Sequence, residues 1–403
     1  HRYSRTQKLA DDFGKALQAA DRVFVTDIYP ASELPIEGVT AQTIVDAIRA
    51  NGDTQAEVVG PVATAHYAVG NALDDGDLLL TLGAGNVHEA GVKISRDMTV
   101  LEEMLRYVGD GAADAKLYEP MRRHTTILCG GPAQFWLEPH SYDAFASFVA
   151  YCRERGIPQR VIGRGSNLLV RDGGIRGAVI HPAGGVFTEV RVEGDVITAG
   201  SGARFKKVAS VAAAHDLTGF EWMEGIPGNV GGGLRMNAGA MGTETFDQVL
   251  SVTFLDEDGE IRERSREEIT THYRNVPELR QNFALAATFQ GKQDEAVTIA
   301  KRMDESKNKR RTSQPIAASA GCIFKNPENI PAGMLVDEIG MKEACVGKAM
   351  VSDVHGNFIV NNGKAKSADV LGLIDKIRAE AKTQRGIIME TEVQIIGEDD
   401  FTF

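Results

Sequence analysis

The spacing of apolar positions separates a first region of alternating strand-like and helix-like segments from a second region rich in glycine. Residues 22–28 form a short β-branched run that predicts a strand, and residues 41–50 place apolar side chains at helical spacing. Residues 77–82 predict a second, buried strand. Strands that alternate with helices indicate parallel βαβ units over residues 1–108.

A small, polar stretch over residues 109–116 is expected to be a linker. After it the strands become short, and glycine-rich turns recur near positions 130, 163, 173, 184 and 231. This pattern of short strands and glycine-rich turns predicts an α+β region with many tight turns. Helical spacing returns over residues 294–310 and 367–385, the second with Ser367 as its expected N-cap and Gly386 as its expected C-cap.

Length and composition narrow the class of protein. A chain of 403 residues suggests two to four domains, and 43% apolar with 25% charged residues is ordinary for a globular protein. The net charge of -12 argues against general nucleic-acid binding. No apolar run is long enough to span a bilayer, and no signal peptide is expected. The start at His1-Arg2-Tyr3, without Met, suggests a piece of a larger protein.

The four cysteines have neither CxxC nor Cys/His metal spacing, so the expectation is reduced thiols in a cytoplasmic protein without a metal site.

One glycine-rich segment reads Gly163-Arg164-Gly165-Ser166-Asn167. Small residues let backbone N–H groups converge on phosphate oxygens, and Ser166 and Asn167 add side-chain donors. An ordinary turn between two strands is an equally good interpretation of this segment by itself.

A denser segment spans residues 225–233, which contain five glycines. Such a run costs conformational entropy, which is tolerated where a ligand must touch the backbone. Because its flanks are apolar, a pyrophosphate cradle is favoured over a flexible surface loop. The candidate cofactor-binding residues here and just beyond are Gly228, Asn229, Gly231, Gly232, Asn237 and Gly239. By contrast, Gly83-Ala84-Gly85 lacks the third glycine of a dinucleotide fingerprint and is expected to be a strand-to-helix turn.

Residues 319–327 read Ser-Ala-Gly-Cys-Ile-Phe-Lys-Asn-Pro and carry the strongest candidate chemistry. The thiol of Cys322 can give up a proton, and Lys325 with Asn326 can hold an anion or a hydrogen-bonding group. The alternative for Cys322 is a small buried apolar residue. That second role is the one expected of Cys129, Cys152 and Cys345.

Residues 117–403 closely resemble the UDP-N-acetylenolpyruvoylglucosamine reductases, through segments that occur in the family's order. The resemblance implies a vanillyl-alcohol-oxidase-type FAD-binding region over 117–300 and a substrate-binding region over 301–403. It also implies FAD, NADPH and the reduction of UDP-N-acetylglucosamine enolpyruvate to UDP-N-acetylmuramate for peptidoglycan. The segments that carry it are 123–126, 130–131, 163–167, 225–228, 237–240, 273–274, 314–315, 320–327, 351–352, 355, 357–361 and 390–393.

The same resemblance implies roles for individual residues. Arg274 would contact the substrate carboxylate, Glu392 would help stabilise the enolic species, and Cys322 stands where many members carry a proton-donating serine. Ser313 occupies the place of a substrate-binding lysine, which leaves one pyrophosphate contact in doubt. A core position is about as good an interpretation for Tyr273. The implied substrate-binding residues are Tyr273, Arg310, Lys325, Asn326 and Asn357.

Residues 1–108 resemble the C-terminal domain of UDP-N-acetylmuramate–L-alanine ligase, through residues 1–6, 27–31 and 83–87. No P-loop occurs, so no ligase activity is expected of this part. The expected fold class is therefore a Rossmann-like domain (α/β), followed by the α+β reductase region. Contact with other peptidoglycan-pathway enzymes is a possible role for the first domain. The competing functions are a related FAD oxidase and a non-catalytic nucleotide-sugar-binding scaffold.

Overall fold

The computed structural model describes residues 1–83 and 85–400, which form two compact units. The first unit holds residues 1–103 with 116–118, and the second holds residues 104–115 with 119–400.

The first unit is built around a βαβ element, as the apolar spacing predicts. Strands β1 and β2 pair in parallel, with Arg22 opposite Gln55. Helix α2 between them begins after Thr40, whose hydroxyl accepts a hydrogen bond from the N–H of Gln42. Val45 and Ile48 of α2 are fully buried. The elements are α1 (Tyr3–Ala16), β1 (Arg22–Thr26), α2 (Ala41–Asn51), β2 (Gln55–Gly60), α3 (Val62–Asn71) and most of α4 (His88–Val108).

The strand predicted over residues 77–82 is wrong. The segment belongs to no helix or sheet, and Leu78, Leu80 and Leu82 are 92%, 69% and 65% exposed. An apolar run becomes a strand only when another strand pairs with it, and no described strand pairs with this segment. Of the turn expected at Gly83-Ala84-Gly85, Ala84 lies outside the described residues.

The second unit begins with a four-stranded sheet whose order is β3-β4-β7-β5. Strands β4 and β5 both run parallel to β7, and helix α5 makes the crossover between them. The sequence of β4 is buried almost without a break, as expected of a strand covered on both faces. The elements are β3 (Ala113–Pro120), β4 (Pro132–Pro139), α5 (Tyr142–Glu154), β5 (Gln159–Val161), β6 (Leu168–Val170) and β7 (Ile175–Ile180).

A five-stranded antiparallel sheet follows, in the order β14-β13-β15-β9-β8. Its apolar face packs with α6 and α7 in one core that includes Phe205, Val230 and Leu234. The elements are β8 (Val190–Glu193), β9 (Val196–Gly200), α6 (Phe205–Ala214), β10 (Leu217–Thr218), α7 (Val230–Met236), β11 (Gly239–Ala240), β12 (Thr243–Glu244), β13 (Val249–Leu255), β14 (Ile261–Ser265), α8 (Glu278–Gln281), β15 (Phe283–Gln290) and β16 (Lys292–Gln293).

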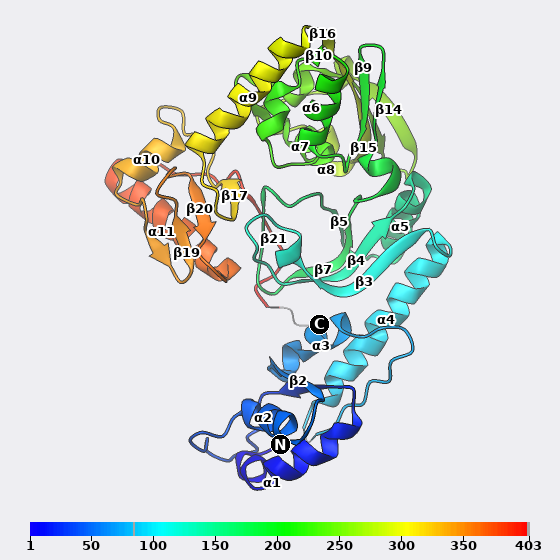
Figure 1. The fold of residues 1–403 in the computed structure, drawn as a ribbon, viewed down its shortest axis with the longest axis vertical. Coiled ribbons are helices and arrows are strands. Elements are labelled where there is room, and N and C mark those ends of the chain that lie inside the picture. The colour runs from blue at the N-terminus through cyan, green and yellow to red at the C-terminus, as the bar shows by residue number, and fades with distance from the viewer. Residues whose placement is uncertain (84, 401–403) are drawn as a thin grey trace. The chain divides into compact units, whose positions relative to one another are not determined.

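Helix α9, yellow in Figure 1, leads from this sheet to a C-terminal lobe whose sheet has the order β17-β20-β19-β18. Helices α10 and α11 pack on that sheet and share its core. The last strand, β21, returns to pair in parallel with β6. The elements are α9 (Ala296–Ser313), β17 (Ser319–Cys322), α10 (Ala332–Glu338), β18 (Cys345–Val346), β19 (Ala349–Val351), β20 (Phe358–Asn361), α11 (Ser367–Arg385) and β21 (Gln394–Ile396).

The structure corrects some of the expected local features and confirms others. The linker expected over residues 109–116 overlaps β3, which starts at Ala113. Helix α11 ends at Gly386 in the left-handed region, as predicted, but its N-cap is Lys366 and not Ser367. Ser367 is instead fully buried, with its hydroxyl donating to the carbonyl of Val170. In the described part of the chain, no helix combines the length and the apolar character needed to cross a membrane.

Candidate active site

Two glycine loops that lie far apart in the sequence meet in the second unit. The first glycine loop (residues 163–167) follows β5, and the second glycine loop (residues 225–233) leads into α7. The N–H of Arg164 donates to Asn229 Oδ1 at 2.9 Å, and a Cβ placed on Gly163 would lie 3.4 Å from the Asn229 side chain. Asn229 Nδ2 donates in turn to the carbonyl of Gly202. Asn229 therefore joins the two loops.

The first glycine loop has the geometry of an anion cradle. Gly165 adopts φ +64°, and a Cβ there would lie 2.2 Å from the carbonyl oxygen of His124, so only glycine fits. Within the described chain, no group accepts a hydrogen bond from the backbone amides of Gly165, Ser166 or Asn167. Successive unpaired N–H groups of this kind suit phosphate oxygens.

Ser201 adds a donor that the sequence analysis missed. Its carbonyl accepts a hydrogen bond from the N–H of Gly231 at 2.8 Å, and its hydroxyl is buried without a partner among residues 1–83 and 85–400. A Cβ on Gly232 would meet no atom within 4 Å, so the loop is open there. The available signal was the sequence Gly200-Ser201-Gly202 at the end of a strand. A buried hydroxyl beside an open glycine loop fits a phosphate-bearing cofactor.

Asn237 and Gly239 shape the chain that follows the second glycine loop. Asn237 ends α7 with φ +41°, and its Nδ2 donates to Glu244 Oε2 at 2.6 Å while its Oδ1 accepts from the N–H of Phe246. A Cβ on Gly239 would lie 2.5 Å from the carbonyl oxygen of Thr243. These two residues therefore hold the β11–β12 hairpin against α7.

Arg274 and Glu392 form a half-buried ion pair. Arg274 Nε donates to Glu392 Oε1 at 2.8 Å, and the two side chains are only 19% and 16% exposed. Arg274 Nη1 lies 3.5 Å from the carbonyl oxygen of Asn237. Arg274 has φ +54°, which is unfavourable for a residue with a Cβ and marks a position held by its surroundings. The guanidinium keeps donors available for a carboxylate ligand.

Cys322, at the end of β17, lies in the electrostatic reach of this pair. Burial, together with the negative charge of Glu392, raises the pKa of its thiol from 9.0 to about 11, against the opposing effects of Arg274 and Arg310. The thiol therefore stays protonated at neutral pH. The first glycine loop is also near, because a Cβ on Gly321 would lie 3.6 Å from the carbonyl oxygen of Ser166.

The first glycine loop also contacts the segment that carries Glu392. Asn167 Nδ2 donates to the carbonyl of Glu392 at 3.2 Å, and the N–H of Gln394 donates to the carbonyl of Asn167 at 3.0 Å. The candidate cofactor cradle and the Arg274–Glu392 pair are thus parts of one site.

Asn357 holds the backbone two residues beyond Cys322. Its Oδ1 accepts from the N–H of Phe324 at 2.9 Å, and its Nδ2 donates to the carbonyl of Phe324 at 2.8 Å. Asn357 is buried, and its contact with the Cys322 thiol lowers the pKa of that group. Its amide is therefore occupied by the protein.

Lys325 and Asn326 are placed differently from the thiol. Lys325 Nζ donates to Glu390 Oε2 at 3.0 Å, and Asn326 Oδ1 accepts from the N–H of Ala332 at the start of α10. Both side chains thus have partners within the protein. His124 and His355 also have structural partners, Glu119 and the N–H of Asn357, respectively.

Arg310 and Tyr273 complete the surroundings of Cys322. Arg310 on α9 packs against the second glycine loop, since a Cβ on Gly225 would lie 3.1 Å from its Cδ. Burial lowers the pKa of Arg310, and the facing thiol opposes that shift. Tyr273 is 55% exposed, with the Arg274 guanidinium 4.9 Å from its ring centroid, so it is not a core tyrosine.

The other three thiols differ in their exposure to solvent. Cys129 and Cys152 are buried, as expected, and burial raises the pKa of each, to about 11 and about 12. Cys345 is exposed, so the prediction of a buried apolar role is wrong for this residue. It lies on β18, at the edge of its sheet, where one side is open to solvent.

Comparison with known proteins decides the family. The chain is 39% identical over 281 residues to UDP-N-acetylenolpyruvoylglucosamine reductase from Clostridium novyi (strain NT), covering 69% of this chain and 91% of that protein. The corresponding enzyme from Bradyrhizobium sp. (strain ORS 278) is 42% identical over 274 residues, 68% of this chain and 89% of the relative. The chain belongs to the UDP-N-acetylenolpyruvoylglucosamine reductase family.

The structural comparison agrees with this family. A crystal structure of UDP-N-acetylenolpyruvylglucosamine reductase from Thermus caldophilus matches with a TM-score of 0.61 and 33% identity, covering 70% of this chain and 98% of that one. The family model "FAD binding domain" matches residues 133–265, which include both glycine loops. The model "UDP-N-acetylenolpyruvoylglucosamine reductase, C-terminal domain" matches residues 314–396, which include Cys322 and Glu392. The presence of an FAD-binding domain and of a reductase C-terminal domain is confirmed.

The reductase family does not account for the whole chain. Arg274 and Arg310 fall between the two matched ranges, and residues 1–108 lie outside both. The expected Mur-ligase-like domain is therefore supported only as a mixed α/β unit with a parallel strand pair.

Proposed function

We propose that this chain is an FAD-dependent reductase that converts UDP-N-acetylglucosamine enolpyruvate to UDP-N-acetylmuramate with NADPH in peptidoglycan synthesis. Family membership supports the reaction, and the joining of the two glycine loops supports the cofactor. The observation that carries the site assignment is the half-buried Arg274–Glu392 pair beside a protonated thiol.

FAD, when bound, would carry a hydride from NADPH to the enolpyruvyl double bond. The backbone amides of residues 165–167 and the hydroxyl of Ser201 would bind its phosphate groups. Gly163, Gly228, Gly231 and Gly232 would allow close approach of the cofactor to backbone, while Arg164, Asn229, Asn237 and Gly239 keep the loops in place.

Arg274 would bind the carboxylate of the enolpyruvyl group, because a guanidinium presents paired donors to a carboxylate. Glu392 holds the guanidinium through Nε and so fixes its orientation. As negative charge develops on the substrate carboxylate and its adjacent carbon, a preoriented cation stabilises that charge more than water does.

Cys322 would donate the proton to that carbon. Its raised pKa keeps the proton on Sγ until the carbon becomes basic enough to take it. Arg310 and Tyr273 flank the thiol and would contact the substrate, whereas the side chains of Lys325 and Asn326 would have to leave their present partners to do so. Asn357 would act by holding the backbone at Phe324, two residues beyond Cys322.

Flavin absorption of the purified protein tests this function. NADPH should bleach the flavin bands, and the enolpyruvyl nucleotide sugar should restore them. In Cys322→Ala, bleaching should continue at the native rate, while restoration should slow by roughly 10²–10⁴-fold, the usual effect of losing a positioned acid. Cys322→Ser should retain substantial turnover, and Cys345→Ala, at the exposed thiol, should match the native protein. Native restoration rates in Cys322→Ala would contradict the assignment of Cys322.

For residues 1–108 the proposal is a C-terminal fragment of UDP-N-acetylmuramate–L-alanine ligase without activity of its own. The resemblance of residues 1–6 and 27–31 and the β1–α2–β2 arrangement support it. The chain should therefore hydrolyse no ATP when UDP-N-acetylmuramate and L-alanine are supplied. ATP-dependent formation of the amide would contradict this proposal.

A further inference from the structure

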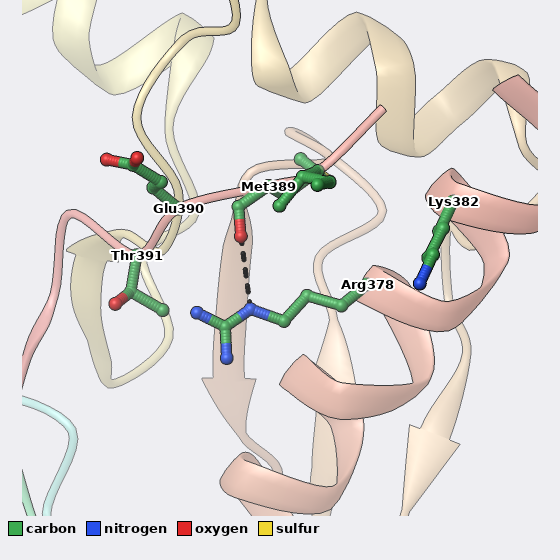
Figure 2. Close-up of a pocket in the computed structure, with 6 residues that line it drawn as sticks. Arg378, Lys382, Met389, Glu390 and Thr391 are labelled. Atoms are coloured by element: carbon green, nitrogen blue, oxygen red, sulfur yellow. Dashed lines mark hydrogen bonds between the residues drawn. The ribbon is translucent and has the colours of Figure 1, made fainter. Parts of the chain in front are cut away.

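A cavity of about 570 Å³ lies in the C-terminal lobe between α11 and the chain that precedes β21. It is lined by Arg378, Lys382, Ile388, Met389, Glu390 and Thr391. Figure 2 shows Arg378 extending from α11 toward the segment that carries Met389, Glu390 and Thr391, with Lys382 on the same helix. None of the six belongs to the proposed cofactor or catalytic residues, and the volume is in the range of small-molecule sites.

The guanidinium of Arg378 is fixed in this cavity. Its Nε donates to the carbonyl of Met389 at 3.1 Å (Figure 2). Among the described residues, its only ion-pair contact is with Asp375, whose carboxylate is 77% exposed and 3.9 Å from Nη1, beyond hydrogen-bond length. The Nη groups of Arg378 therefore retain donor capacity in a fixed orientation, as a site for a doubly hydrogen-bonded anion requires.

Lys382 adds a second positive charge one helical turn from Arg378, on the same face of α11. Within residues 1–83 and 85–400, its ammonium group forms no hydrogen bond or ion pair. Glu390, the single acidic residue of the lining, is engaged by Lys325 at 3.0 Å. The cavity is thus net positive although the whole chain carries a formal charge of -12.

The segment that faces α11 forms the opposite wall and contributes the apolar side chain of Ile388 beside the polar residues Glu390 and Thr391. Ile388 is 80% exposed, and the hydroxyl of Thr391 stands at the same wall. A ligand that fits both walls combines an anionic group with an apolar or planar part. We infer that this cavity is a second binding site, distinct from the reductase centre, for a small phosphate-bearing molecule.

A simpler role exists for the two cations. Lys382 lies in the last turn of α11, where a positive charge stabilises the helix dipole without any ligand. That role predicts an effect of Lys382 on helix stability and no saturable anion binding. The experiment must therefore measure binding directly and locate it.

Titration calorimetry with inorganic pyrophosphate tests the inference, on the full chain loaded with FAD. Pyrophosphate bound at the reductase centre is unaffected by a change on α11, so the part of the binding signal that Lys382→Glu removes reports on this cavity. The native protein should show saturable binding. Lys382→Glu should weaken binding by about tenfold or more, since it replaces an attraction by a repulsion. Lys376→Glu changes the net charge equally at an exposed position of α11 outside the cavity and should leave the affinity within twofold.

Methyl NMR spectra place the ligand. The Ile388 δ1-methyl resonance should shift with the same saturation curve as the calorimetric signal. AMP should bind more tightly than inorganic phosphate if a base packs on Ile388, whereas equal affinities would limit the ligand class to phosphate anions.

Three results would overturn the inference. They are the absence of saturable pyrophosphate binding at millimolar concentration, equal weakening by Lys376→Glu and Lys382→Glu, and an unshifted Ile388 methyl. Because turnover is measured separately on the same preparation, failure of this site leaves the reductase proposal untouched.

Discussion

Two arginine–glutamate pairs in the second unit have nearly the same geometry and opposite surroundings. Arg274–Glu392 closes at 2.8 Å with side chains 19% and 16% exposed, whereas Arg385–Glu338, between α11 and α10, closes at 2.7 Å with side chains 47% and 41% exposed. Water screens the outer pair, so its contribution to stability is small. In the inner pair, loss of either partner leaves the other charge partly desolvated, which destabilises the folded protein. Partly buried charges of this kind are also typical of active sites. Burial, and not distance, separates a functional pair from a surface contact.

Turnover should show the largest difference between the two pairs. Glu392→Gln removes the charge that orients Arg274, so kcat should fall by about 10²–10³-fold, the usual effect of losing one electrostatic element of a preorganised site. The matched change Glu338→Gln, at the exposed pair, should leave kcat within twofold. Steady-state assays of NADPH oxidation measure both, with FAD content determined for each variant. Equal rates in the two variants would refute the special role of the inner pair.

The pattern of expected and unexpected results has a physical reason. The glycine loops and the Cys322 segment could be found from sequence because each depends on local chemistry, and the structure brings them together. The hydrogen-bond partners of Asn357 and Asn326 could not be found in this way. A side-chain amide can bind a ligand or a backbone N–H group, and the sequence does not distinguish the two. The strand expected over residues 77–82 failed for a similar reason, since pairing depends on chain elsewhere.

Burial should also separate the reactivity of two thiols, Cys322 and Cys345. Burial raises the pKa of Cys322 from 9.0 to about 11, so at pH 8 its thiolate fraction is about 100-fold below that of an ordinary thiol. Alkylation of Cys322 by iodoacetamide should therefore be slow and should keep accelerating up to about pH 11. Cys345, which is exposed, should react first. Mass spectrometry of peptides after timed labelling gives both rates, and faster labelling at Cys322 than at Cys345 would contradict the burial argument.

The same pKa shift has a consequence for stability. Because the folded-state pKa of Cys322 lies above its unfolded value, the neutral thiol favours the folded state. This contribution is fully present below about pH 9 and is lost as the pH rises through about 11. Native protein should lose more unfolding free energy across that interval than Cys322→Ser, measured by denaturant titration. Identical losses in the two proteins would show that the thiol titrates normally.

Stability should also separate the two ion pairs, by a smaller margin. Glu392→Gln leaves the Arg274 guanidinium partly buried without its counter-charge and should lower the free energy of unfolding by about 1–3 kcal/mol. Glu338→Gln should change it by less than about 0.5 kcal/mol. Urea unfolding of the two variants measures this, and high salt should weaken only the outer pair's contribution. A larger loss for Glu338→Gln would reverse the ranking by burial.

Removal of the first unit should have the smallest effect on turnover. The reductase elements, including Arg274, Cys322 and Glu392, all lie in the second unit, whose own core accounts for their positions. The cut belongs before Met104 and not after residue 108, because residues 104–115 group with the second unit and Met104 is fully buried. A chain starting at Met104 should keep its FAD and native kcat within twofold, while a chain starting at residue 109 should be less stable. Loss of FAD from the chain that starts at Met104 would show that the second unit depends on the first for its fold and its cofactor.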